Sequence, residues 1–287
     1  MSKINLAIFR QRYSLPLEIK VEWTKRRIKD FYNHFNGQVF VSFSGGKDSQ
    51  VLVEIIKEMG HPYDEIELVF FDTHNENPSV LEIVDRYKAK KIESPLTPKQ
   101  VIDKVGYPLF NKDVANVIDD IQRGVAYTKN PNAKRCEQVK QIKQRYADFI
   151  NSPLRISDKC CDELKKNPSK SFVKETGKYP IIATLAVESR NRMMSYLNHG
   201  CNIFEGGYIK STPMGMWSMK NVLEYIALKN LKIADCYKAE IKDGVCKLHG
   251  CRQTGCMFCG FGKGMDYAYR ILKAKCPEYY ALLKRED

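Results

Sequence analysis

The chain has 287 residues, 43% of them hydrophobic, which is enough for one large domain or for a domain with an appendage. Its formal net charge of +13 favours polyanionic partners such as nucleotides and leaves nucleic acid open, although a lysine-rich solvated surface accounts for it equally well. No apolar run approaches the roughly 18 residues of a membrane span, and the N-terminal residues show no signal-peptide pattern, so we expect a cytoplasmic protein without membrane contact.

The elements predicted along the chain begin with a helical segment. Residues 1–36 carry apolar side chains at three- and four-residue steps, as amphipathic helices do. Residues 38–43 (QVFVSF) and 66–71 (IELVFF) are apolar runs typical of buried strands, and each is followed by a loop and a helix pattern. A third such run spans residues 179–187. This alternation predicts an α/β fold with a doubly wound, mostly parallel sheet that binds ligands at the carboxyl ends of its strands.

The same pattern predicts three consecutive parts of the chain. They are a helical N-terminal segment at 1–36, a nucleotide-binding α/β domain at 37–235, and a Cys-rich segment with a C-terminal helix at 236–287. Ten cysteines in a chain without a visible secretion signal favour metal binding or catalysis over disulfides. Isolated cysteines, such as Cys136, Cys201 and Cys236, fit the role of small buried hydrophobic residues.

A glycine-containing hexapeptide joins the first strand to its helix. Its residues are Ser44, Gly45, Gly46, Lys47, Asp48 and Ser49. Two glycines allow the backbone to approach an anion closely, and the N–H groups of a helix start supply partial positive charge. Lys47 adds a full charge, and the two serines add hydroxyl donors. Asp48 either helps to hold Mg²⁺ beside phosphates or caps the helix. The spacing is not that of a Walker-A loop.

SGGKDS resembles the PP-loop of the superfamily of ATP pyrophosphatases and phosphoadenosine phosphosulfate (PAPS) reductases, whose fold is adenine nucleotide alpha hydrolase-like. The resemblance implies that the loop holds the pyrophosphate of ATP or the phosphosulfate of a sulfonucleotide, with Lys47 and Asp48 as catalytic residues. Residues 69–78 (VFFDTHNENP) are similar to the DTG-x-E-x-P segment of PAPS reductase-like proteins. Asp72 and Thr73 match and would lie beside the adenosine, whereas His74 stands where glycine is usual.

A later segment extends the resemblance. Residues 183–192 (ATLAVESRNR) resemble the family's G-x-R-x-x-ES-x-x-R pattern, with Glu188, Ser189 and Arg192 matching. The match implies nucleotide-binding roles for Glu188 and Ser189. It also implies that Arg192 offers its guanidinium to a phosphate or sulfate; the alternative is a surface arginine.

Four cysteines resemble the [4Fe–4S] arrangement of the adenylylsulfate reductase branch. They are the adjacent pair Cys160 and Cys161 and the C-x-x-C pair Cys256 and Cys259. Four thiolates are what such a cluster needs, and the resemblance implies that Lys159, Lys165 and Lys166 around the first pair offset its charge. Two alternatives stay open: zinc, which usually draws on two spaced pairs, and no metal. Cys251 lies close by in the sequence and is taken as a spectator.

The resemblance stops at the C-terminus, because the chain has no ECGLH-like motif with a nucleophilic cysteine. Cys276 lies in a segment with a helical packing pattern and is not expected to replace it. We therefore favour an enzyme that uses ATP, releases pyrophosphate and forms an adenylate, with sulfur transfer from a thiol or sulfur donor protein onto an acceptor such as nucleic acid. The alternatives are a sulfonucleotide reductase that makes sulfite and a non-catalytic regulator that binds nucleotide and nucleic acid.

Overall fold

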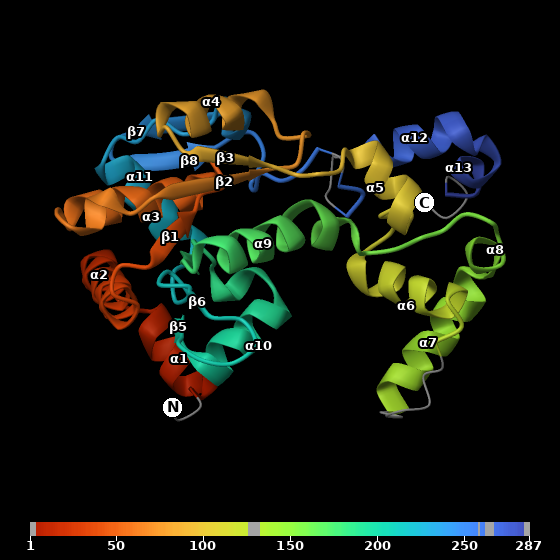
Figure 1. Ribbon diagram of the computed structural model, residues 1–287, viewed down its shortest axis with the longest axis horizontal. Coiled ribbons are helices and arrows are strands. Elements are labelled where there is room, and N and C mark those ends of the chain that lie inside the picture. The colour runs from red at the N-terminus through yellow and green to blue at the C-terminus, as the bar shows by residue number, and fades with distance from the viewer. Residues whose placement is uncertain (1–3, 126–132, 258, 262–266, 284–287) are drawn as a thin grey trace. The chain divides into compact units, whose positions relative to one another are not determined.

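The computed structural model describes residues 4–125, 133–257, 259–261 and 267–283 (Figure 1). The chain forms two compact units, each assembled from stretches that are distant in sequence. We call them the sheet unit (1–71, 77–92 and 169–254) and the cysteine unit (72–76, 93–168 and 255–287). The two units therefore alternate along the chain. The three parts expected from the sequence, at 1–36, 37–235 and 236–287, follow one another instead.

The sheet unit is built on a six-stranded sheet of order β3-β2-β1-β4-β6-β5. The strands are β1 (Val39–Ser42), β2 (Leu68–Asp72), β3 (Lys90–Glu93), β4 (Tyr179–Ile181), β5 (Asn202–Ile203) and β6 (Lys210–Ser211). β1 runs parallel to β2 and β4, β4 runs parallel to β6, and β5 is antiparallel to β6. The predicted α/β fold with a mostly parallel sheet is confirmed.

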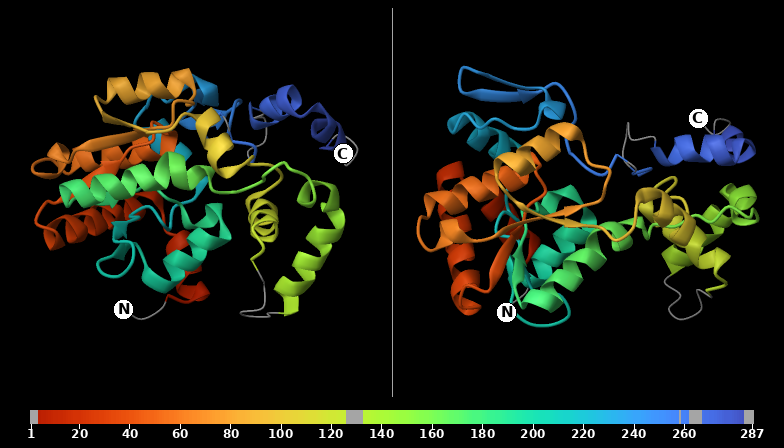
Figure 2. Two further views of the ribbon diagram at one scale, coloured as in Figure 1. Left: turned by 45° about the vertical axis from the view of Figure 1, so that its right-hand side comes forward. Right: turned by 45° about the horizontal axis from the view of Figure 1, so that its top comes forward.

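Helices flank this sheet (Figure 2). They are α1 (Leu6–Tyr13), α2 (Leu17–His34), α3 (Lys47–Glu58), α4 (Pro78–Arg86), α9 (Asn167–Thr176), α10 (Arg190–His199) and α11 (Met219–Leu228). Short 3-10 turns lie at Tyr63–Glu65, Ala186–Glu188 and Asp235–Tyr237. Successive side chains of a strand point to opposite faces: Phe40 packs on Phe172 of α9, with ring centroids 4.9 Å apart, while Val39 and Val41 belong to a larger core on the other face.

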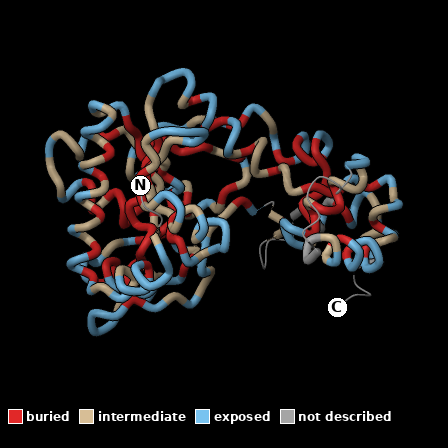
Figure 3. The backbone as a smooth tube through the Cα atoms, turned by 90° about the horizontal axis from the view of Figure 1, so that it is seen from below, coloured by how far each residue is buried: buried red, intermediate tan, exposed pale blue. Residues whose placement is uncertain are grey.

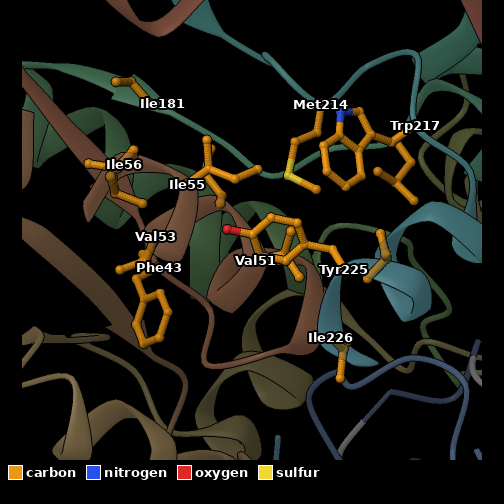
Figure 4. Close-up of a cluster of buried hydrophobic side chains, with 14 of the residues drawn as sticks. Phe43, Val51, Val53, Ile55, Ile56, Ile181, Met214, Trp217, Tyr225 and Ile226 are labelled. Atoms are coloured by element: carbon orange, nitrogen blue, oxygen red, sulfur yellow. The ribbon is translucent and has the colours of Figure 1, made fainter. Parts of the chain in front are cut away.

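That larger core gathers around α3. Figure 3 colours the buried residues of the chain red. In Figure 4, Ile55 of α3 lies near Met214, Trp217 and Tyr225, which come from the loop after β6 and from α11. The Trp217 indole is fully buried, and its Nε1–H donates to Thr24 Oγ1 of α2 over 3.0 Å. One polar pair inside the apolar cluster thus ties α2 to the segment that leads into α11.

A β-hairpin follows α11 in the sheet unit, where the sequence shows little periodicity. Its strands are β7 (Ala239–Lys242) and β8 (Val245–Leu248), paired in antiparallel register. The turn is Asp243-Gly244, and both residues have positive φ, 50° and 73°. An Asp-Gly pair with this conformation is the turn that matches the twist of two-residue hairpins.

The cysteine unit is mainly helical. Its helices are α5 (Pro98–Val105), α6 (Lys112–Gln122), α7 (Ala133–Arg145), α8 (Ala147–Ile150), a π-helical turn (Asp162–Lys166), α12 (Tyr267–Lys275) and α13 (Pro277–Leu283). Its core contains Leu109, Ile118, Phe149 and Ile156. The single C-terminal helix expected from about Asp266 is two helices in the described part of the segment. No described helix is long and apolar enough to cross a lipid bilayer.

We predict that Thr24→Val lowers the free energy of unfolding by about 1–3 kcal/mol, because it leaves the Trp217 N–H buried without an acceptor. Urea denaturation measures the loss. Trp217→Phe removes the donor instead, so the double variant should lose less than the sum of the single losses. Additive losses would show that the hydrogen bond carries no stability of its own.

Candidate functional site

The loop after β1 is compressed between two parts of the sheet unit. Gly45 has φ +67°, and a Cβ there would lie 2.8 Å from Val80 Cγ1 and 2.9 Å from Val80 O in α4. A Cβ on Gly46 would lie 2.9 Å from Thr254 Oγ1. Neither position accepts a side chain without movement of its neighbours, so both glycines are needed for this path of the backbone.

The two loop serines hydrogen bond within the loop. Ser49 Oγ donates to Gly46 O over 2.8 Å, and Ser44 Oγ donates to Ser49 Oγ over 3.1 Å. The Gly46 N–H in turn donates to Ser44 Oγ over 3.3 Å. These bonds fix the shape of the loop at the start of α3, where the partial positive charge of a helix N-terminus collects.

Lys47 and Asp48 form an ion pair in the first turn of α3. Lys47 Nζ lies 3.0 Å from Asp48 Oδ2, and the lysine side chain is fully buried. The other carboxylate oxygen, Asp48 Oδ1, is buried and has no hydrogen-bond partner among the described residues. A buried charged atom without a partner is costly, so this oxygen would gain from a cation or a water molecule.

Tyr237 and Thr254 cover the loop, and sequence reasoning did not select them as site residues. The Lys47 backbone N–H donates to the Tyr237 hydroxyl over 3.1 Å, and that hydroxyl lies 3.2 Å from Thr254 Oγ1. Lys47 Nζ lies 5.4 Å from the centroid of the Tyr237 ring. Burial of Tyr237 raises its pKa, so the phenol stays neutral. Thr254 lies two residues before Cys256 of the C-x-x-C pair, and this proximity is the sequence signal that could have identified it.

The segment after β4 brings Glu188, Ser189 and Arg192 together at the start of α10. Ser189 is the N-cap, and its Oγ accepts the Arg192 N–H over 3.2 Å. The Arg192 guanidinium pairs with Glu188 Oε2, while Gln253 Nε2 donates to Glu188 Oε1 over 2.8 Å. One oxygen of Glu188 therefore binds Arg192, and the other binds Gln253, which is the residue directly before Thr254.

The Asp72–Glu76 stretch belongs to the cysteine unit. Asp72 Oδ1 accepts the His74 N–H over 2.8 Å, and His74 Nε2 donates to Ser94 O over 2.9 Å. His74 has φ +58°, a left-handed conformation that glycine adopts without strain. This conformation accounts for the glycine that is usual at position 74 in the family pattern. In this chain, the hydrogen bonds of His74 to Asp72 and Ser94 compensate for its strained backbone.

Thr73 lies against the cysteines. Its side chain is fully buried, with Oγ1 2.9 Å from Glu76 Oε1 and 3.5 Å from Cys256 Sγ, so its one hydroxyl hydrogen serves either acceptor. Asn75 Nδ2 lies 3.9 Å from the same sulfur, and Asn75 O accepts the Met257 N–H over 2.8 Å. The role beside an adenosine that the sequence predicts for Thr73 stays a prediction.

The four candidate cluster cysteines lie in the cysteine unit. Cys160 hydrogen bonds to Cys161; this bond, burial, and the charges of Cys161, Cys259 and Cys256 raise the pKa of Cys160. The same bond, followed by the cations Lys112 and Lys165, lowers the pKa of Cys161 to about 6 against the opposing effect of burial. The thiols are therefore close enough to influence one another, and one of them is poised as a thiolate, the form that binds metals.

The donor set fits an iron–sulfur cluster in number and type, since it offers four cysteines, two of them buried and two partly buried. Among the described residues, however, no three or more His, Cys, Asp or Glu side chains converge as ligands of a metal ion. The four thiols are thus neighbours rather than a preformed cage, and ligation would require them to turn toward a common centre. One cation beside them is Lys112, whose Nζ lies 3.7 Å from Cys161 Sγ, and the sequence did not single it out.

Residues 38–105 match the model of the phosphoadenosine phosphosulfate reductase domain. The predicted resemblance to the PAPS reductase-like family is confirmed. The match contains β1, the loop, α3 and β2, and it supports a PAPS reductase-like adenine-nucleotide enzyme of sulfur metabolism with a PP-loop. No curated protein matches the chain.

The PAPS reductase match covers the PP-loop together with Asp72 and Thr73, but it ends before Glu188, Arg192 and the cysteines. The structure places Glu188 and Arg192 in the same unit as the PP-loop, linked to it through Gln253 and Thr254. Their roles in nucleotide binding, and the roles of the cysteines in cluster binding, remain predictions.

We predict that Gly45→Ala destabilises the protein more than Gly60→Ala. Both glycines have nearly the same positive φ, +67° and +66°, but a Cβ on Gly60 meets nothing within 4 Å. Both variants should lose about 1–2 kcal/mol through backbone strain, and Gly45→Ala a further 1–3 kcal/mol, roughly, through its clash with Val80. Equal losses in urea denaturation would contradict the compression of the PP-loop.

Proposed function

We propose that the protein is an ATP-dependent PP-loop enzyme that adenylates an acceptor and couples this to sulfur transfer. The observation that carries the proposal is the loop at residues 44–49: a glycine turn at the carboxyl end of a parallel strand, opening a helix whose first residue is a buried lysine. Ligands of open α/β sheets bind at this edge, and anions bind at such helix starts.

The proposed chemistry is attack of the acceptor on the α-phosphate of ATP, with release of pyrophosphate. Lys47 and the loop N–H groups would stabilise the charge that develops on the departing pyrophosphate. Asp48 already neutralises Lys47, and its second oxygen has no hydrogen-bond partner among the described residues, which suits it to hold Mg²⁺ beside the phosphates. Arg192 would assist by binding a phosphate, after exchanging its bond with Glu188 for the ligand.

The cysteine unit would supply the sulfur chemistry. Cys160, Cys161, Cys256 and Cys259 would hold a [4Fe–4S] cluster, which, when bound, supplies iron sites that handle sulfur. Lys112 and Lys165 would offset the negative charge of the thiolates and attract an anionic substrate. The +13 net charge of the chain suits a polyanionic acceptor such as nucleic acid.

The second candidate is a sulfonucleotide reductase that makes sulfite, and the family of the matching domain favours it. It requires a nucleophilic cysteine outside the four cluster candidates. Release of sulfite from adenylylsulfate or PAPS in the presence of a thiol, with no pyrophosphate formed from ATP, would select this candidate over the first.

We predict that Lys47→Ala weakens ATP binding by about ten- to a hundredfold, the value of one hydrogen bond to a charged group. Equilibrium binding of ATP measures the loss. Lys57→Ala is the matched control, because Lys57 lies on the same helix, pairs with Glu54 and is half exposed. The double variant Lys47→Met/Asp48→Asn removes both charges of the ion pair, so no buried carboxylate is left without its partner. It therefore distinguishes a loss of ATP binding from a loss of folding. Unchanged ATP binding in this double variant would refute the proposed role of Lys47.

We predict about four irons and four acid-labile sulfides per chain in protein purified without oxygen, and loss of both in Cys256→Ala. Iron, sulfide and zinc analysis with a visible spectrum makes the measurement. Cys246→Ala is the control, since Cys246 is equally buried but belongs to β8 in the sheet unit. About one zinc per chain instead would make the cysteines a structural site, and no metal would remove the sulfur-transfer proposal.

A further inference from the structure

A second pair of cysteines lies in the sheet unit, apart from the four cluster candidates. Cys236 lies in the 3-10 turn before β7 and Cys251 follows β8, so the two residues flank the β7–β8 hairpin. The Cys251 N–H donates to Cys236 O over 3.0 Å. The two residues are therefore in direct backbone contact across the base of the hairpin.

Gly250 shows how closely the two arms approach. A Cβ on this residue would lie 2.2 Å from Cys236 O and 2.8 Å from the Tyr237 carbonyl carbon. The backbone hydrogen bond and the hydrogen bond between the two cysteine side chains bring the sulfurs close enough for a disulfide to form. Both cysteines are partly exposed, so an oxidant in solution can reach them.

The side chains also contact each other. Burial, and then the hydrogen bond with the Cys236 side chain, raise the pKa of Cys251 to about 11. The Lys47 ammonium acts on Cys251 in the opposite direction, which places the pair beside the PP-loop. Cys251 therefore remains protonated and donates to the Cys236 sulfur.

The pair flanks the residues that cover the PP-loop. Cys236 directly precedes Tyr237, whose hydroxyl accepts the Lys47 N–H, and Cys251 lies three residues before Thr254, which contacts that hydroxyl. The Cys236 N–H donates to Ser79 Oγ of α4 over 3.1 Å. A bond between the two sulfurs would fix both arms of the hairpin at the point where they meet the loop.

We propose that Cys236 and Cys251 are an oxidative modification site whose disulfide clamps Tyr237 onto the PP-loop. Peroxide is the oxidant: one sulfur forms a sulfenic acid as the O–O bond breaks and water leaves, and the second thiol displaces a second water to form the S–S bond. Two thiol hydrogens and two electrons thus pass to one peroxide. The clamp keeps the Lys47 N–H occupied, so it opposes binding of a phosphate there; this last consequence depends on the proposed function.

Peptide mapping of the full chain tests the cross-link. Trypsin releases Cys236 in residues 233–238, Cys251 in 248–252 and Cys246 in 243–247, each without another cysteine. After mild peroxide treatment and alkylation, we expect the first two peptides to be joined, with the loss of two hydrogen masses, and to separate on reduction. Cys246, which faces no cysteine across the hairpin, should remain alkylated. If the Cys236 and Cys251 peptides stayed separate in protein whose other thiols were oxidised, the proposal would be overturned.

Hydrogen exchange and ATP binding test the clamp. Oxidation should slow amide exchange at residues 44–49 and weaken ATP binding by about tenfold, the value of one competing hydrogen bond. Both effects should be absent in Cys251→Ser and kept in Cys246→Ser. A disulfide that changes neither exchange nor affinity would overturn the clamp. If ATP binds in neither state, the proposed function fails, while the mapping and exchange results still decide this inference.

Discussion

The close approach of four chain segments at Gly45 and Gly46 is the constraint on which the rest of the site depends. The PP-loop leaves β1 against Val80 of α4 and passes beneath Thr254, with no room for a side chain at either glycine. Because the loop is confined on both sides, its path determines where α3 begins and where the N–H groups of that helix point. The serine hydrogen bonds then hold the path from within.

The buried charges at the loop add little to the stability of the fold. Lys47 is fully buried with Asp48 as its partner, and burying an ion pair gains little over packing hydrophobic side chains of the same size. One oxygen of Asp48 also lacks a hydrogen-bond partner among the described residues. A fold selected only for stability gains nothing from such a group. Under the proposed function, the loop would receive phosphates and a cation, and both charges would have to be in place before the ligand arrives.

The sequence predicted the parts of the fold that rest on local patterns. β1, the loop and α3 follow from an apolar run, a glycine pair and a helix period within twenty residues. β3 was missed because Lys90–Glu93 is a largely exposed edge strand without apolar alternation. Tyr237 was missed for a different reason: it meets Lys47 across 190 residues, and nothing local in the sequence encodes such a contact. The interleaving of the two units is equally non-local.

The cysteines show most clearly that local sequence does not predict contacts between distant residues. All ten carry the same thiol, and the resemblance of the CC and C-x-x-C pattern to the adenylylsulfate reductase branch separated out the four cluster candidates. Their surroundings divide the others further: Cys201 and Cys246 are buried in the core of the sheet unit, where a thiol acts as a small hydrophobic residue. Cys236 and Cys251 are instead partly exposed and face each other. Fourteen residues lie between them in the sequence, and the hairpin with its Asp243-Gly244 turn brings them together. The chemistry of a cysteine in this chain is therefore decided by the partner that the fold places beside it.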